Sequence, residues 1–369
     1  MRSTVDHTRR AATLGPEAPT SECPARVHSV FRAAANLKLS DGALLTLLSL
    51  DGFGIPFGVR LSTIEDFDGL GLEVGDAGVV RPDAIVIERS NGRRPFQVDC
   101  ATAKRLAAPP LPPLRGNGAN WRAGVALLEA LQERAATDLR VAPLLRGARS
   151  PAATGRRLAH AACDLGRAVR TGEFGPMRDA AARLVGLGQG LTPAGDDFLC
   201  GFAAAAHCRC AARPALAPHL AQFADAVRER LDQTTEISAA FLRSALAGRL
   251  SEPLAELIEA CAGGGENDVE GAVARLARVG HSSGLDAATG FFYGAAAFGG
   301  VASWGAQLKI ASMNLPRVCG GAEPRRPAAD DNWAQPAPRP EVVGSGSGAA
   351  TDQGGRTSAE GLCSNISLI

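Results

Sequence analysis

The pattern of apolar residues changes near residue 107, and this change divides the chain into two parts of different structural class. Before it, short apolar runs occupy residues 44–50, 57–61, 84–88 and 96–100, separated by Asp-Gly and Asn-Gly turn signals. Runs of this length between such turns are typical of β-strands. The spacing predicts a small antiparallel, barrel-like β domain over residues 26–106.

The second part has a helical composition. A linker rich in Pro and Gly covers residues 107–120, and beyond it Ala, Leu, Arg and Glu dominate. These residues favour helix in seven segments, at residues 121–136, 154–170, 176–185, 197–212, 218–248, 253–261 and 269–279. We therefore expect a mainly α-helical domain over residues 121–312, and the fold class α+β. The apolar segment 285–308 is rich in Gly and Ala, which favours a buried helix over a membrane span.

Both ends of the chain differ from these domains. Residues 1–25 are polar and contain several prolines, so we expect a disordered extension. Residues 313–369 contain few large apolar side chains and many Pro, Gly and Ser, which predicts a disordered tail. An alternative explanation of this tail is a frame-shifted end, and the sequence leaves both open.

Charge and cysteine content limit the function classes. A net charge of +1 and a pI near 7.6 give no basis for binding nucleic acid or a membrane surface. The nine cysteines are scattered among alanines, which favours reduced thiols in a cytoplasmic protein. The basic residues are nearly all arginine and alanine is abundant, a composition typical of a GC-rich bacterial genome. His207, Cys208 and Cys210 resemble half of a metal site, but no second cysteine pair stands at ligand spacing.

Residues 186–202 contain a glycine-rich segment that leads into an apolar helix. Gly186, Gly188 and Gly190 permit a positive φ and a close approach to a ligand. Thr192 followed by Pro193 suits the start of a helix. The free N–H groups of such a loop and the helix dipole favour binding of an anion.

Two aspartates follow this loop within the first helical turn. Asp196 and Asp197 place negative charge where the helix dipole also favours it, so helix capping is one interpretation. A single cap needs neither the second aspartate nor the glycines, which favours a place for a proton or a cation. Mg²⁺ is the cofactor that this pair would hold, with Asp196 and Asp197 as its ligands.

A second copy of the motif occurs later in the chain. The spacing Gly-x-Asp-x-x-x-Gly-Phe that begins at Gly195 recurs at Gly284, with Asp197 and Asp286 at the equivalent place. The second glycine of each copy lies on the same helical face as the aspartate and admits another backbone. The repeat predicts that the two helices pack together and bring both aspartates to one pocket. The alternatives are a capping box at Ser283 and a chance repeat.

Two further segments complete the candidate site. His281 precedes two serines and has the chemistry of a proton donor, although a histidine at a helix start often bonds only to backbone. The hydroxyl-rich residues 233–238 interrupt a helical pattern, either as a cap or as hydrogen-bond donors to the pocket. The catalytic candidates are Asp196, Asp197, His281 and Asp286. The substrate-binding candidates are Gly188, Gly190, Thr192, Thr234, Thr235, Arg243, Ser282 and Ser283.

Several well-known signatures are missing from the sequence. No Gly-Lys-Ser/Thr follows the glycines, no strand is expected before them, and no Gly-x-Ser-x-Gly occurs. These absences argue against a nucleotide-binding P-loop, a dinucleotide fold and a serine nucleophile.

The segment Gly-Leu-Gly-Gln-Gly-Leu-Thr-Pro-Ala-Gly-Asp-Asp at 186–197 resembles the hallmark of an uncharacterised bacterial family that includes the AllH-type subunit of oxamate carbamoyltransferase. The resemblance extends to residues 27–31, 36–37, 234–238 and 281–286. It implies a part in allantoin and purine catabolism, where oxalurate and phosphate yield oxamate and carbamoyl phosphate. The implied ligands are small anions, carbamoyl phosphate and oxamate, and the implied partners are companion subunits. A non-catalytic interaction subunit and a Mg²⁺-dependent phosphotransfer enzyme are the alternatives.

Overall fold

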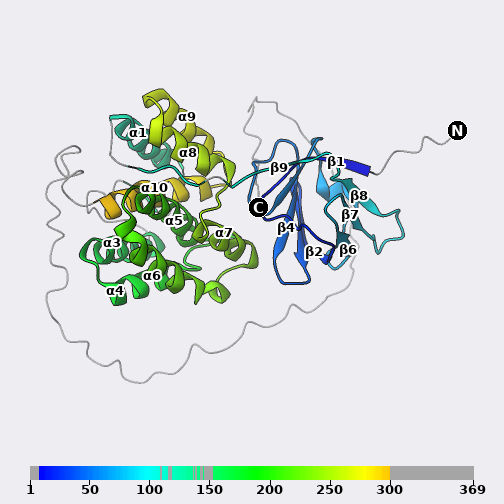
Figure 1. Cartoon of the computed structure of the whole chain (residues 1–369), viewed down its shortest axis with the longest axis horizontal. Helices are drawn as coiled ribbons and strands as arrows, with labels where there is room; N and C mark the ends of the chain where they lie inside the picture. Colours follow the sequence, from blue (N-terminus) through cyan, green and yellow to red (C-terminus); the bar gives the residue numbers. More distant parts are fainter. Residues whose placement is uncertain are drawn as a thin grey trace, which may run out of the picture. The chain divides into compact units, whose positions relative to one another are not determined.

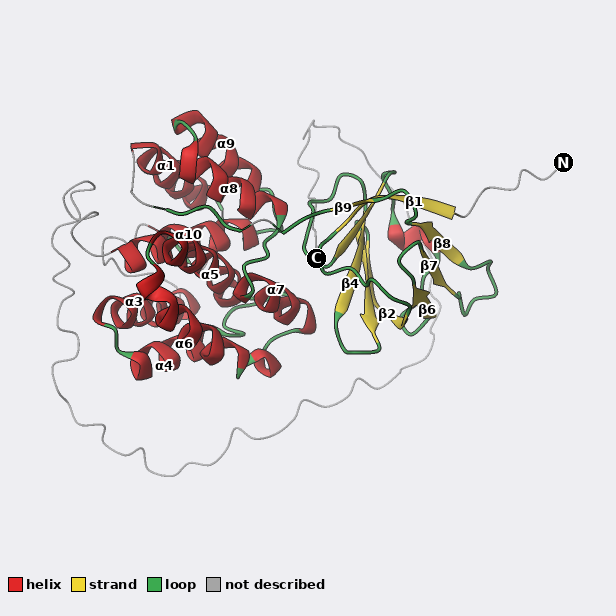
Figure 2. Ribbon diagram, in the orientation of Figure 1, coloured by secondary structure: helices red, strands yellow, loops and turns green. Residues whose placement is uncertain are grey.

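The computed structural model describes residues 8–299, apart from residues 109, 115–118, 136, 138, 142–143 and 145–152. It contains a closed β-barrel followed by a helical region (Figure 2). The predicted α+β class is therefore confirmed. The expected tail at 313–369 and residues 300–308 of the apolar segment lie outside the described residues.

Eight strands close the barrel in the order β5-β4-β3-β2-β6-β7-β8-β1, and β1 pairs again with β5. Most pairs are antiparallel, but β1–β8 and β4–β5 are parallel. A ninth short strand, β9 (Lys104–Arg105), adds to β1. The barrel strands are β1 (Thr8–Leu14), β2 (Cys23–Phe31), β3 (Ala34–Leu39), β4 (Leu44–Leu48), β5 (Gly58–Leu61), β6 (Ala77–Val80), β7 (Ala84–Ile87) and β8 (Phe96–Asp99).

Ordered structure begins earlier than the expected domain boundary at residue 26. Residues 8–14 form β1, which pairs with β5 on one side and with β8 on the other. Only Ala11 and Leu14 of this strand are buried, so the segment lacks the alternation that marks a strand. Pairing with distant strands stabilises it, and a local pattern does not report such pairing.

Side chains from all sides of the barrel fill its interior, as in other eight-stranded barrels. The largest buried side chains include Leu37, Leu45, Leu61 and Phe67. Strand β4 is buried on both faces because Leu44 and Leu48 form a second cluster with Ile237 and Ala240 of the helical region. This double burial explains why β4 is a continuous apolar run.

Polar contacts accompany that cluster. Lys38 Nζ lies 2.7 Å from a carboxylate oxygen of Glu236, and His28 Nε2 lies 3.4 Å from the other. Glu252 accepts hydrogen bonds from the N–H of Gly54 and from Arg60 at 2.9 and 3.1 Å. The two acidic residues stand at the starts of consecutive helices, where their charge also complements the helix dipole.

The helical region is built round one central pair, α5 (Ala194–Ala212) and α10 (Ser283–Gly299). In Figure 1 these two lie side by side, with α3, α4 and α6 on one side and α1, α8 and α9 on the other. The remaining helices are α1 (Ala119–Arg134), α3 (Ala153–Thr171), α4 (Phe174–Leu184), α6 (Ala217–Arg228), α7 (Glu236–Leu246), α8 (Glu252–Gly263) and α9 (Glu266–Leu276). None of the helices in the described part has both the length and the hydropathy of a membrane span.

The segment predicted as helical over residues 218–248 is divided in the structure. Helix α6 ends at Arg228, a short 3₁₀ turn η3 (Leu231–Gln233) follows, and α7 begins at Glu236. Thr235 is the N-cap of α7, because its Oγ1 accepts a hydrogen bond from the N–H of Ser238 at 3.0 Å. The hydroxyl-rich cluster therefore does cap a helix, as one of its two interpretations stated.

Candidate functional site

Helices α5 and α10 touch backbone to backbone at the second glycine of each repeat. A Cβ on Gly201 would lie 1.9 Å from the carbonyl oxygen of Ala287, and a Cβ on Gly290 would lie 1.9 Å from that of Phe198. These two contacts are equivalent within the repeat. The close approach that the repeated spacing predicted is therefore present in the structure.

The first glycine of each repeat has an equivalent role as well. A Cβ on Gly195 would lie 2.1 Å from the carbonyl oxygen of Leu184, and one on Gly284 would lie 1.7 Å from that of Leu276. Leu184 and Leu276 are the last residues of α4 and α9. Each central helix thus begins against the end of the helix before it, so the repeat reflects a shared local structure.

The two central helices run in the same direction, so their N-terminal ends come together. Thr192 Oγ1 lies 2.8 Å from Ser283 Oγ at the N-terminal end of the pair. Toward the other end, a Cβ on Gly294 of α10 would lie 3.1 Å from Ala205 Cβ of α5. Two positive dipole ends therefore meet beside the glycine loop, where the resulting field favours negative charge.

All three loop glycines have a positive φ. Gly186 has a φ of 69° and Gly188 has a φ of 139°, and neither has room for a side chain. A Cβ on Gly186 would lie 2.3 Å from the carbonyl oxygen of Gln233, and a Cβ on Gly188 would lie 2.6 Å from the backbone nitrogen of Ala194. Gly190, at 90°, faces open space within the described structure. The first two glycines are needed for packing, whereas only backbone conformation requires the third.

Asp196 is a buried anchor for three segments. Its Oδ1 accepts a hydrogen bond from the N–H of Gly186 at 2.8 Å, and its Oδ2 accepts bonds from the hydroxyls of Ser238, at 2.7 Å, and Thr234. Burial raises the pKa of this carboxyl, and the three hydrogen bonds oppose that rise. The side chain ties the glycine loop and the start of α7 to α5.

Asp197 has a different environment, although it is the next residue. The residue is partly exposed, but its Oδ2 is buried and receives no hydrogen bond from the described residues. Burial raises the pKa of Asp197 to about 8; the Ser283 and Thr192 hydroxyls oppose this and the charge of Asp196 adds to it. The shift favours the protonated form of this carboxyl, which is the form that can donate a proton.

The other predicted residues have more varied positions. Asp286 is fully buried in the first turn of α10, and its sharing of a pocket with Asp197 stays a prediction. Thr235 Oγ1 donates to the carbonyl oxygen of Leu191 at 2.5 Å, which fastens the glycine loop to α7. His281 is exposed, Ser282 is half-buried, and Arg243 is exposed on α7.

Two places in the sequence carry residue types that can bind a metal ion, the aspartate pair and the segment 207–210. Within the described residues, no three His, Cys, Asp or Glu side chains form a cluster that would hold an ion. His207 Nε2 lies 3.2 Å from the carbonyl oxygen of Leu246, and Cys208 is buried. Asp196 already uses both carboxylate oxygens within the protein, so the donor set of the aspartate pair does not suit Mg²⁺.

The sequence did not distinguish the roles of the two aspartates. Side chains of neighbouring residues on a helix point about 100° apart. Asp196 therefore lies on the inner side of the glycine loop, whereas Asp197 faces α10. A signal was available in the repeat, because the residue equivalent to Asp196 in the second copy is the buried Leu285. Asp196, which has no equivalent aspartate in the second copy, is the residue that anchors the glycine loop before α5.

Two family models match this chain. Residues 184–295 match the model described as oxamate carbamoyltransferase subunit AllH, and residues 9–105 match the AllH family N-terminal domain. The chain belongs to the AllH family. Searches of curated proteins and of solved structures found no match. The AllH match contains the glycine loop and both copies of the repeat, and the second match covers nearly the whole barrel. The family assignment makes the chain a carbamoyltransferase-related subunit.

Proposed function

We propose that this AllH-family chain is a subunit of an oxamate carbamoyltransferase and that its ligands bind where the N-terminal ends of α5 and α10 meet. Two family-model matches support the reaction class. The single observation that carries the site is the Asp197 carboxyl, whose Oδ2 receives no hydrogen bond from the described residues, beside two convergent helix N-termini.

The reaction requires one proton to move. An oxygen of hydrogen phosphate attacks the terminal carbamoyl carbon of oxalurate, and the bond from that carbon to the oxalyl nitrogen breaks. The nitrogen leaves as the amide of oxamate and gains a proton, while the phosphate oxygen loses one and becomes part of carbamoyl phosphate. Atoms and charge balance without a protein nucleophile, which agrees with the absence of a serine elbow in the sequence.

Asp197 is the proposed proton carrier. With a pKa near the working pH, it gives its proton to the leaving nitrogen and regains one from phosphate, as an efficient general acid and base should. Thr192 and Ser283 lie at the same carboxyl, one from each helix start, and are placed to orient it. Such positioning and proton transfer are the main contributions that a carbamoyl transfer requires.

Binding of the anions is assigned to the helix ends. The positive dipole ends at the starts of α5 and α10 and the backbone of the loop at Gly190 have the polarity that phosphate and oxamate require. The N–H groups of Gly195, Asp196 and Gly284 already bond to backbone carbonyls, so the helix ends act through their field. Gly190 is the loop glycine with open space beside it, so a ligand can approach its backbone there. Companion subunits, which the family name implies, would complete the enclosure of the ligands.

The alternatives have less support. A pure interaction subunit would present its glycine motifs to a partner, but Gly201 and Gly290 are used between α5 and α10 of this chain. A Mg²⁺-dependent phosphotransferase would need both aspartates as ligands, and Asp196 is engaged by three protein donors. Carbamoyl transfer needs neither arrangement.

The test uses the full chain, purified with any subunits that co-purify with it from its native host. We expect calorimetry to detect binding of carbamoyl phosphate and oxamate, and a colorimetric assay to detect oxamate-dependent release of phosphate. Asp197→Asn should keep the binding and lower kcat by about 100-fold or more, whereas Arg122→Gln on the exposed face of α1 should change neither. Absence of binding in every preparation, or an Asp197→Asn enzyme with full kcat, contradicts the proposal.

A further inference from the structure

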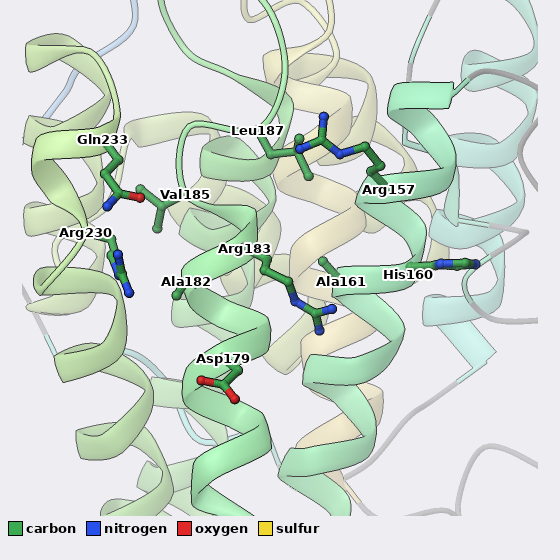
Figure 3. Close-up of a pocket in the computed structure, with 10 residues that line it drawn as sticks. All are labelled: Arg157, His160, Ala161, Asp179, Ala182, Arg183, Val185, Leu187, Arg230 and Gln233. Carbon is green, nitrogen blue, oxygen red and sulfur yellow. The ribbon is translucent and has the colours of Figure 1, made fainter. Parts of the chain in front are cut away.

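A concave groove of about 710 Å³ lies between α3, α4 and the turn η3 (Figure 3). Of the segments that the sequence indicated for the candidate site, the 233–238 cluster contributes Gln233 to its lining. Its volume is within the range of pockets that bind small molecules. The polar lining side chains are Arg157, His160, Asp179, Arg183, Arg230 and Gln233.

The lining is strongly cationic. The lining contains three guanidinium groups, from Arg157, Arg183 and Arg230, and one carboxylate, that of Asp179. Asp164 holds Arg183 in place through a contact of 2.8 Å. Arg157 and Arg230 form no ion pair with any described side chain, so their full charge is available to a ligand. Arginine binds phosphate and carboxylate in a bidentate manner, which suits it to this role.

The three guanidinium groups occupy separate places round the groove. In Figure 3, Arg157 lies near Leu187, Arg230 lies beside Gln233, and Arg183 lies between α3 and α4, while the His160 ring points away from them. A single small ion cannot contact all three at once. The arrangement instead fits a molecule whose negative groups are spaced apart.

One end of the groove is held rigidly from inside the protein. Val185 and Leu187 line it and flank Gly186, whose N–H bonds to Asp196. Gln233 lines it as well and precedes Thr234, whose hydroxyl bonds to the same carboxylate. The buried aspartate therefore fixes both chain segments, and a preformed wall reduces the entropic cost of binding.

We propose that this groove binds a small organic anion that carries at least two separated negative groups, either phosphates or carboxylates. The proposal does not rest on the carbamoyltransferase reaction, because Asp197 and the helix N-termini form no part of the lining. A chain that lacks transferase activity would still bind such an anion here.

The test is isothermal titration calorimetry of the full chain at low ionic strength. ADP is the phosphate probe, citrate is the carboxylate probe, and adenosine is the uncharged control. We expect at least one of the two anions to bind, adenosine not to bind, and Arg157→Gln and Arg230→Gln each to weaken the affinity about tenfold. Both arginines are exposed, so the variants should fold, which circular dichroism checks.

Arg122→Gln provides the matched control, because Arg122 is an exposed helical arginine outside the lining. We expect it to leave the affinity unchanged. The proposal is overturned if neither anion binds, if both groove variants bind as the wild type does, or if Arg122→Gln weakens binding equally. Which probe binds distinguishes phosphate recognition from carboxylate recognition.

Discussion

The substitution Asp197→Asn should reveal the protonation state of the candidate proton carrier through the stability of the fold. Burial raises the pKa of Asp197 to about 8 in the native state, whereas an exposed aspartate in the unfolded chain ionises near pH 4. Between these values the native state binds one more proton than the unfolded state. The free energy of unfolding of the wild type therefore falls as the pH rises through this window.

The magnitude follows from the size of the window. A difference of one bound proton changes the free energy of unfolding by about 1.4 kcal/mol for each pH unit. Asparagine has nearly the same shape and does not titrate. The stability of Asp197→Asn relative to wild type should therefore increase by about 3 kcal/mol from pH 5 to pH 7, and should stop increasing above about pH 8.

Urea denaturation followed by circular dichroism at pH 5, 6, 7 and 8 measures the free energy of unfolding of the variant and of the wild type. The contributions of the other titrating groups cancel in the difference between the two proteins. Asp179→Asn is the matched control at an exposed carboxylate on α4, and its difference from wild type should stay within about 0.5 kcal/mol. A difference for Asp197→Asn that is independent of pH would show that the buried carboxyl is ionised, and the proton-donor role would fail.

Two further predictions concern the supports of the site, both measured by urea denaturation. Asp196→Ala should destabilise the fold by about 2–4 kcal/mol, because it leaves the Gly186 N–H and two hydroxyls without their acceptor; a loss below about 1 kcal/mol would refute the anchoring role. Gly201→Ala should cost about 3 kcal/mol by forcing α5 from α10. The control variant Gly271→Ala, inside α9, should increase the free energy of unfolding by about 0.5–1 kcal/mol. Equal effects of the two substitutions would contradict the close contact between α5 and α10 at Gly201.

The β-strands show what local patterns can and cannot predict. Strands β4, β5, β7 and β8 were predictable, because each is an apolar run next to a turn. Strand β1 was not, since it pairs with partners about fifty and ninety residues away and has only two buried side chains. Strand order depends on such long-range pairing, and no periodicity in the sequence reports it.

The candidate site was predictable to the extent that it depends on short spacings. The repeat beginning at Gly195 and Gly284 predicted contact between two helices, because glycines one turn after an aspartate admit another backbone. The arginine groove had no such signal. Arg157 and Arg230 belong to segments far apart in the chain, and only the packing of α3 against α4 and η3 brings them to one surface.

Comparison of the two repeat copies indicates which features belong to the fold and which to the site. Both copies contain the glycines that allow helix contact, so these glycines are requirements of packing. Both copies also have an aspartate in the first turn. The loop before α5 is longer than the loop before α10 and includes three glycines with positive φ. Asp286 is fully buried, whereas Asp197 is partly exposed. The longer loop with its three glycines is therefore what distinguishes the surroundings of the partly exposed Asp197 from those of the buried Asp286.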